Sequence, residues 1–95
     1  MAKYELMLIV DTSISEEQRN TSVSELKALL EKNEAKITKE DVWGDKKMAY
    51  KIGKTDRGFY ILFDLEMNGK SIKEMSKIIN LDKNIVRYMF TRVDA

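Results

Sequence analysis

The sequence contains no cysteine, no histidine and no proline. Without cysteine the chain can form neither a disulfide nor a thiolate metal site, and the reducing cytoplasm is the expected compartment. Without histidine it lacks the side chain most used for proton transfer near neutral pH and the commonest nitrogen ligand of metals. Any catalysis would therefore have to rest on carboxylates, lysines or hydroxyls.

Long apolar runs are also absent. The apolar residues 6–10 are followed by Asp11 before the core of a signal peptide could form, and no other stretch is long enough to span a membrane. The chain also has no large excess of positive or negative charge, because 17 basic and 16 acidic residues leave a net charge of +1. Total charge therefore predicts nothing about nucleic acids, and only the distribution of the charges can.

Apolar periodicity predicts the elements of the first half of the chain. Residues 3–10 are typical of a central strand that is partly covered on both faces. Ser15 and Gln18 have the spacing of a capping box, which predicts that a helix begins there. We expect this helix to end near Asn33, which tolerates a left-handed cap. Its buried stripe consists of Val23, Leu26, Leu29 and Leu30.

The second half predicts a strand hairpin, a helix and a last strand. Residues 35–52 indicate a long, irregular strand with Gly44 at a bend or bulge. Residues 53–58 are turn-forming, and residues 59–67 are the strongest strand pattern in the chain. Asn68 can cap a second helix, and residues 86–93 indicate the final strand. The apolar stripe of that helix consists of Ile72, Met75, Ile78 and Ile79.

The order of these elements predicts an α+β fold, a ferredoxin-like βαββαβ sandwich formed by one domain over residues 1–95. A hydrophobic content of 43% suits one modest core, and no linker or low-complexity segment divides the chain. Two helices cannot cover both faces of a four-stranded antiparallel sheet. Both should therefore pack on one face and leave the other open.

Alternation along the strands sorts their residues between the two faces. In residues 59–67 the odd positions should face the helices, in the first strand the even positions should, and in the last strand Tyr88 and Phe90 should. The open face then carries an apolar set that a partner protein could cover: Met7, Ile9, Tyr60, Leu62 and Met89. The alternative, that single exposed apolar side chains are ordinary on any sheet, agrees equally well with the sequence.

Basic residues gather in residues 44–57 although their total is balanced. The basic residues of this segment are Lys46, Lys47, Lys51, Lys54 and Arg57, against only Asp45 and Asp56. The hairpin end is thus a candidate phosphate-binding region. On charge alone the favoured alternative is that lysines along an edge strand prevent edge-to-edge aggregation.

The segment at residues 57–63 looks like the ribonucleoprotein motif of RNA-recognition domains, which stacks bases on exposed aromatic rings. Ile61 stands where that motif needs a second aromatic ring, and alternation turns Phe59 towards the helices. We therefore do not expect bases to stack across the centre of the sheet.

The segment at residues 44–52 carries a more specific resemblance. It reads Gly44-Asp45-Lys46-Lys47-Met48-Ala49-Tyr50-Lys51-Ile52 and resembles the signature of the bacterial small-subunit ribosomal protein six family. The resemblance continues at Lys3-Tyr4-Glu5, Gly58-Phe59-Tyr60, Leu65-Glu66-Met67 and Asn84-Ile85-Val86-Arg87. It therefore covers nearly the whole chain, and the order of elements agrees as well.

This resemblance implies a non-catalytic structural component of the bacterial small ribosomal subunit, cytoplasmic and ribosome-associated, without a cofactor. Such a protein binds the central domain of small-subunit ribosomal RNA together with ribosomal protein eighteen, which would meet the apolar open face. In that family basic residues meet the RNA backbone. By similarity the RNA-binding residues are Lys3, Lys46, Lys47, Lys54, Arg87 and Arg92.

The chain departs from the family pattern in three places. Glu34 stands where a glycine often follows the first helix, which leaves Asn33 to make the turn, and Met48 stands where leucine is typical. The chain also ends at Ala95 without the extended tail of many members, so the resemblance supports no contact made by such a tail.

Two other function classes fit the same scaffold. An enzyme would need a loop that holds an anion, but residues 11–15 contain no glycine or arginine, so we expect no catalytic residue, no metal and no small-molecule substrate. A free-standing ferredoxin-like regulatory domain that binds a ligand is the more plausible alternative. It would usually be fused to an enzyme or dimerise through its sheet edges.

Overall fold

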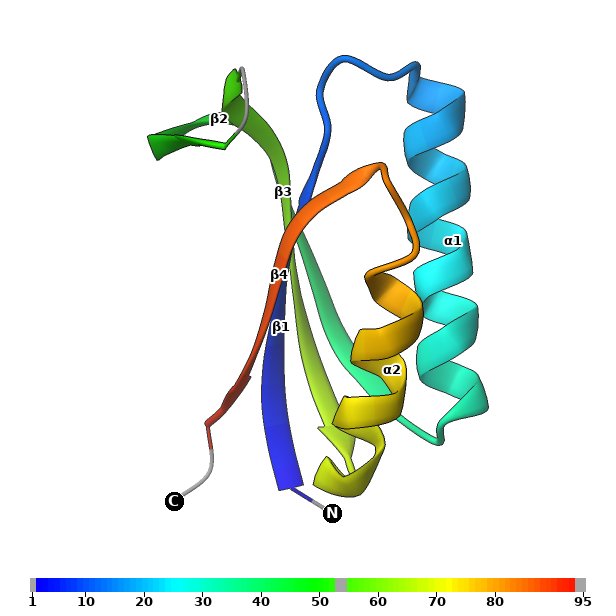
Figure 1. The fold of residues 1–95 in the computed structure, drawn as a ribbon. Coiled ribbons are helices and arrows are strands. Elements are labelled where there is room, and N and C mark those ends of the chain that lie inside the picture. The colour runs from blue at the N-terminus through cyan, green and yellow to red at the C-terminus, as the bar shows by residue number, and fades with distance from the viewer. Residues whose placement is uncertain (1, 53–54, 94–95) are drawn as a thin grey trace.

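The computed structural model describes residues 2–52 and 55–93, and describes side chains outside residues 48–56. The elements along the chain are β1 (Ala2–Val10), α1 (Glu16–Lys32), β2 (Lys36–Ile52), β3 (Thr55–Met67), the short 3₁₀ helix η1 (Gly69–Ser71), α2 (Ile72–Ile79) and β4 (Ile85–Arg92). The strands form one antiparallel sheet in the order β2-β3-β1-β4. Both α-helices lie on the same face of this sheet (Figure 1). The predicted ferredoxin-like α+β sandwich is confirmed.

The first helix begins at the predicted capping box. The Ser15 hydroxyl accepts from the Gln18 backbone N–H at 3.1 Å, and the Gln18 side-chain oxygen accepts from the Ser15 N–H at 3.2 Å. These two bonds satisfy backbone donors that the first turn of a helix cannot pair internally. The acidic Glu16 and Glu17 follow, where the positive end of the helix dipole favours them.

The turn after α1 differs from the sequence-based expectation. Glu34 adopts the left-handed conformation, with φ of 61°, whereas Asn33 has φ of −95°. The prediction that Asn33 makes the left-handed turn is therefore wrong. The Asn33 side chain instead donates to the Leu29 carbonyl at 2.9 Å, and the Ala35 N–H returns to the Leu30 carbonyl at 2.9 Å. These bonds close the helix end one residue before the left-handed position, as is common.

The β2–β3 hairpin is longer than predicted and is bent. The pairing of Ile52 with Thr55 starts β3 at Thr55 rather than at residue 59, because the strands stay paired through most of the expected turn. The predicted bulge at Gly44 is confirmed, since its φ is 85° and the register shifts between Val42 and Gly44. Bulges bend the strand that carries them. The hairpin end accordingly curves away from the helices, on the side of the uncovered face (Figure 1).

The second helix is preceded by an extra turn. Asn68 accepts from the Lys70 N–H at 3.0 Å and so caps η1 rather than α2, which begins at Ile72. The last strand, Ile85–Arg92, lies one residue earlier than residues 86–93.

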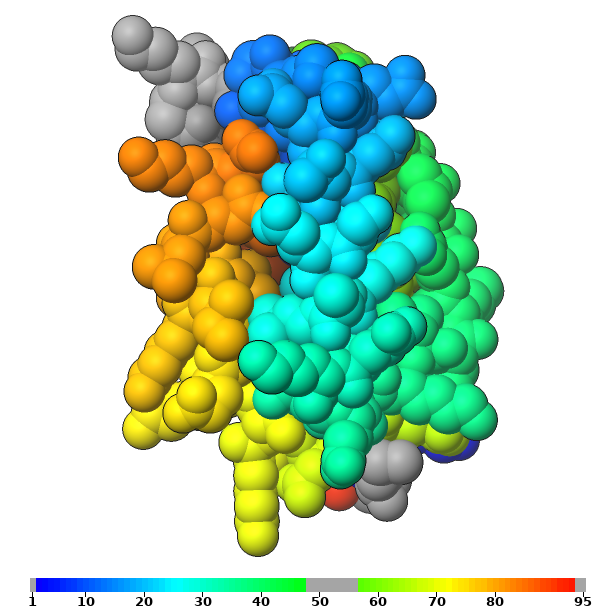
Figure 2. All heavy atoms as spheres, turned by 90° about the vertical axis from the view of Figure 1, so that its right-hand side faces the viewer, coloured from blue at the N-terminus to red at the C-terminus, as the bar shows by residue number. Residues whose placement is uncertain are grey.

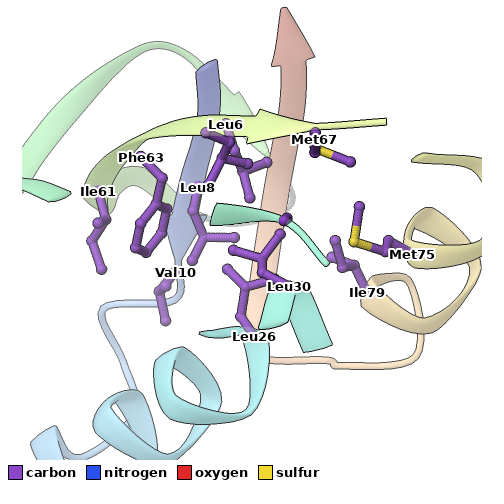
Figure 3. Close-up of a cluster of buried hydrophobic side chains, with 12 residues drawn as sticks. Leu6, Leu8, Val10, Leu26, Leu30, Ile61, Phe63, Met67, Met75 and Ile79 are labelled. Carbon is purple, nitrogen blue, oxygen red and sulfur yellow. The ribbon is translucent and has the colours of Figure 1, made fainter. Parts of the chain in front are cut away.

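The hydrophobic core lies between the helices and the face of the sheet that the alternation predicts. Figure 3 shows side chains of β1 and β3 pointing towards those of α1 and α2. Its buried members include Leu6, Leu8, Val10, Ile61, Phe63, Leu65, Met67, Leu26, Leu30, Met75 and Ile79. Burial of each large aliphatic side chain contributes about 1.5–3 kcal/mol. This core therefore holds the sheet against the two helices.

Candidate functional site

The sheet face opposite the helices is the candidate site. In the register, Met7 of β1 lies between Leu62 of β3 and Met89 of β4, and Ile9 lies between Tyr60 and Arg87. Residues directly opposite one another on antiparallel strands share a face. The sheet thus brings all the predicted partner-binding residues onto one face. No described helix covers that face (Figure 1).

Ile9 belongs to this face by register but is not available for contact. It is only 3% exposed. A Cβ atom on Gly58 would overlap the Cγ2 atom of Ile9, so the isoleucine lies over bare glycine backbone where the hairpin passes it. The prediction that Ile9 offers exposed apolar surface to a partner is therefore wrong. Its packing instead supports the base of the hairpin.

The remaining apolar residues of this face form what we call the apolar strip, which consists of Met7, Tyr60, Leu62 and Met89. Three of them are half-buried by their neighbours on the sheet, and Met89 is 43% exposed. A strip of this kind loses further contact with water when another surface covers it, and that loss favours docking.

Trp43 extends the apolar strip, a position that was not predicted from the sequence. Its ring stacks on Tyr60 with 6.4 Å between the ring centroids and 9° between the ring planes, and the residue is 46% exposed. Val42 pairs with Ile61 and Gly44 pairs with Tyr60, so Trp43 is the extra residue of the bulge. Simple alternation fails at a bulge, which can re-aim a side chain. The available signal was the single tryptophan directly before the bulge glycine.

The predicted RNA-binding residues divide into two groups. Lys46 and Lys47 lie opposite Gly58 and Arg57 on the hairpin, and Arg87 lies opposite Ile9 on β4. Lys3 and Arg92 lie at the other end of the sheet, opposite Glu66 and Tyr4. Lys3 and Ile9 are six positions apart along β1, which is about 20 Å in a strand. All five cations are exposed, but they do not form one patch, and Lys54 lies outside the described residues.

Two further arginines lie near the base of the hairpin, Arg57 in β3 and Arg19 on α1, on the helix side of the sheet. The Arg57 Nε atom donates to Asp45 Oδ1 at 3.0 Å, and the Arg19 guanidinium lies 4.0 Å from the centroid of the Phe59 ring. Stacking on an aromatic face holds a guanidinium in place while its edges can still donate hydrogen bonds. Arg19 is distant in sequence from residues 44–57, so counting charges along the chain could not assign it to this region.

The two ends of the open face differ in charge balance. At the far end, Glu66 lies between Lys3 and Lys36 in the register, and Asp64 lies between Glu5 and Lys39. Charges alternate in sign across the first row, whereas the second row has two carboxylates and one lysine, so the two rows together balance. Among the side chains that the structure describes at the hairpin end, Lys46, Lys47 and Arg57 stand against one carboxylate, that of Asp45. An approaching phosphate is therefore favoured more strongly at the hairpin.

Two other kinds of feature are not found in the described part of the chain. It contains no group of three or more carboxylates placed to hold a metal ion. None of its helices is both long enough and apolar enough to cross a membrane.

Fold and surface together define a ferredoxin-like α+β sandwich with one uncovered, partly apolar sheet face and a cationic hairpin at one end. A family model described as Ribosomal protein S6 matches residues 3–92. The chain belongs to the ribosomal protein S6 family, whose members are structural ribosomal proteins and not enzymes.

Individual relatives agree over nearly the full length of both chains. The small ribosomal subunit protein bS6 of Fusobacterium nucleatum is 37% identical over 94 residues, which are 99% of this chain and 100% of that one. The bS6 protein of Acidothermus cellulolyticus is 33% identical over 95 residues, covering 100% of this chain and 99% of its own. The crystal structure of 30S ribosomal protein S6 from Thermotoga maritima superposes with a TM-score of 0.90 at 28% identity, covering 97% of this chain and 87% of that one.

Proposed function

We propose that this protein is a structural component of the small ribosomal subunit, associated with ribosomes in the cytoplasm. In this role its single domain, residues 1–95, binds the central domain of small-subunit ribosomal RNA together with ribosomal protein eighteen. The observation that carries the proposal is the match of residues 3–92 to the ribosomal protein S6 family. The uncovered sheet face and the hairpin supply surfaces suited to these two partners.

We assign binding of the RNA backbone to the predicted cations, and first of all to those near the hairpin. Lys46, Lys47 and Arg87 are exposed there. Contacts between basic side chains and phosphates supply much of the affinity of such proteins and carry little sequence information. Lys3 and Arg92 would serve as a second group of contacts about 20 Å away, where the nearby carboxylates weaken their attraction for phosphate.

We assign binding of the partner protein to the apolar strip and Trp43. Aromatic residues and methionine are enriched in the buried centres of protein interfaces, where charged residues are depleted. Met89 and Trp43 contribute the most exposed apolar surface of this face, at 43% and 46% exposure. The cations lie at the margin of this face, so the protein can bind RNA and the partner protein at the same time.

The test compares RNA binding by wild type with the double variant Lys46→Glu/Lys47→Glu, with and without ribosomal protein eighteen. We expect binding to weaken by about tenfold or more and equally for different RNA sequences, because phosphate contacts are lost. The dependence of log affinity on log salt should fall by about one to two units. Filter binding across a salt series measures both quantities.

The matched control is Lys70→Glu/Lys73→Glu, which changes the charge equally at exposed lysines of η1 and α2. We expect it to bind RNA within about threefold of wild type, as for a charge distant from the contacts. An equal loss of RNA affinity in both variants would show that the effect depends only on the total charge of the protein. Unchanged binding by the hairpin variant would remove Lys46 and Lys47 from the RNA site.

A further inference from the structure

The helix layer carries a groove that the sheet-face contacts leave free. It has a volume of about 540 Å³ and lies between α1 and the segment that joins α2 to β4. Figure 2, which looks onto the helix layer, shows the surface hollowed between α1 in cyan and this segment in orange. Its walls include Glu17, Thr21 and Glu25 on one side and Ile78, Leu81 and Asp82 on the other.

The groove exposes apolar surface that the fold does not require. Ile78 is 49% exposed and Leu81 is 79% exposed, the highest value among the large hydrophobic residues described. A smaller depression beside them reaches the core residues Leu26 and Ile79. Two aliphatic side chains at the lip of an apolar floor offer an anchoring place for another aliphatic side chain.

The rim of the groove is acidic. Glu17, Glu25 and Asp82 line it, against the single cation Lys83. A second depression along α1 adds Glu16 and continues past Glu17 and Glu25. Such a rim repels phosphate and attracts lysine or arginine. It also opposes docking of a second copy through the same groove, because a symmetric contact would bring the two sets of carboxylates together.

One wall is held in place before any ligand arrives. The Asn84 side-chain amide donates to the Ser22 hydroxyl at 3.2 Å, and the Asn84 carbonyl accepts from the Asp11 N–H at 2.8 Å. The Asn84 N–H donates to Asp82 Oδ1 at 2.9 Å. These bonds join the segment after α2 to α1 and to the end of β1. A groove formed in advance loses less conformational entropy on binding.

We propose that this groove binds a basic segment of a partner protein that carries an aliphatic anchor. The anchor lies against Ile78 and Leu81, and lysine or arginine side chains on either side of it meet Glu17, Glu25 and Asp82. This docking needs no RNA and leaves the open sheet face uncovered. It is therefore tested separately from the proposed binding of RNA and ribosomal protein eighteen.

The test uses the isolated full chain and synthetic peptides of about 15 residues. The probe peptide carries leucine and lysine at helical spacing; one companion has serine for each leucine, and the other has glutamate for each lysine. We expect amide NMR shifts on α1 and on residues 78–84, and an affinity at least about tenfold higher for the probe than for either companion. Equal binding of the serine companion, or shifts confined to another surface, would overturn the proposal.

Variants identify the contribution of the groove itself. Ile78→Ser/Leu81→Ser should lower the affinity for the probe peptide by about tenfold, the loss expected when an aliphatic contact is removed. The matched control Val42→Ser/Val93→Ser removes aliphatic side chains that are 54% and 49% exposed on other elements, and it should bind as wild type does. Glu17→Lys/Glu25→Lys should weaken binding by a similar factor, whereas Glu31→Lys/Glu74→Lys should not.

The control variants show whether a loss of peptide affinity depends on the groove or only on the overall composition of the protein. Equal weakening in a groove variant and its control would overturn the proposal. Sedimentation equilibrium without peptide supplies the last check. A dimer of wild type that Ile78→Ser/Leu81→Ser abolishes would assign the groove to a second copy of the chain and would also overturn it.

Discussion

The two faces of the sheet are built from alternate residues of the same strands and end in different states. On the helix side Leu6, Leu8 and Val10 are fully buried. Between them on β1, Met7 on the open face remains half-buried, next to the half-buried Leu62 of β3. Both faces have apolar side chains, but only one receives the helices. Apolar alternation therefore selects the face on which each residue lies, whereas the burial of that residue depends on what the rest of the chain places over it.

Charge separates the molecule in a second direction. The described side chains at the hairpin end include Lys46, Lys47 and Arg57 with Asp45, whereas the groove of the helix layer carries three carboxylates and one lysine. The net charge of +1 is summed over the whole chain and does not show this separation. Each region can therefore attract a partner of opposite charge, although the protein as a whole is close to neutral.

The largest expected effect tests the difference between the faces directly. Leu8→Ala should lower the free energy of unfolding by about 2–5 kcal/mol, because it leaves a cavity in a closed core. Leu62→Ala on the open face should cost less than about 1.5 kcal/mol, since part of that side chain already contacts water. Urea unfolding followed by circular dichroism measures both losses. Equal losses would mean that the open face is packed as tightly as the core.

A smaller effect is expected where the hairpin covers Ile9. Gly58→Ala should cost about 1–3 kcal/mol, because the new Cβ atom overlaps the Ile9 side chain. In an Ile9→Ala background the same change should cost clearly less, since the overlapping methyl group is gone. A double-mutant cycle on unfolding free energies measures this coupling. Additive losses would contradict the steric account of the burial of Ile9.

The smallest expected effect on stability concerns the stack of Trp43 and Tyr60. A cycle of Trp43→Ala and Tyr60→Ala should give a coupling of about 0.5–1.5 kcal/mol, as for other aromatic pairs. Trp43→Ala should also weaken the binding of ribosomal protein eighteen by about tenfold, the effect of losing an exposed aromatic anchor.

The matched control for this variant is the preceding residue. Val42 is 54% exposed and pairs with the core residue Ile61, so alternation turns it towards the helix side. Val42→Ala should leave the affinity for ribosomal protein eighteen unchanged. Calorimetric titration of the two variants measures the difference, and equal weakening would show that the interface is not confined to the open face.

Most of the fold could be predicted from local signals. The capping box at Ser15, the bulge at Gly44 and the two faces of residues 59–67 were all visible as patterns within a few residues, and the structure confirms them. The turn after α1 was assigned to the wrong residue, because Asn33 and Glu34 are neighbours and only the hydrogen bonds of the helix end distinguish them. The family resemblance also rested on short segments that could be recognised one by one.

The sequence by itself determined the order of elements, the core face of each strand and the family, because periodicity, capping and motifs depend on residues close together in the chain. Only the tertiary structure decided that Gly58 covers Ile9, that Trp43 joins Tyr60, and that the predicted RNA-binding cations lie in two groups. These facts depend on strand register and on the bend of the hairpin. Both bring together side chains from distant segments, and neither is encoded in any one of those segments alone.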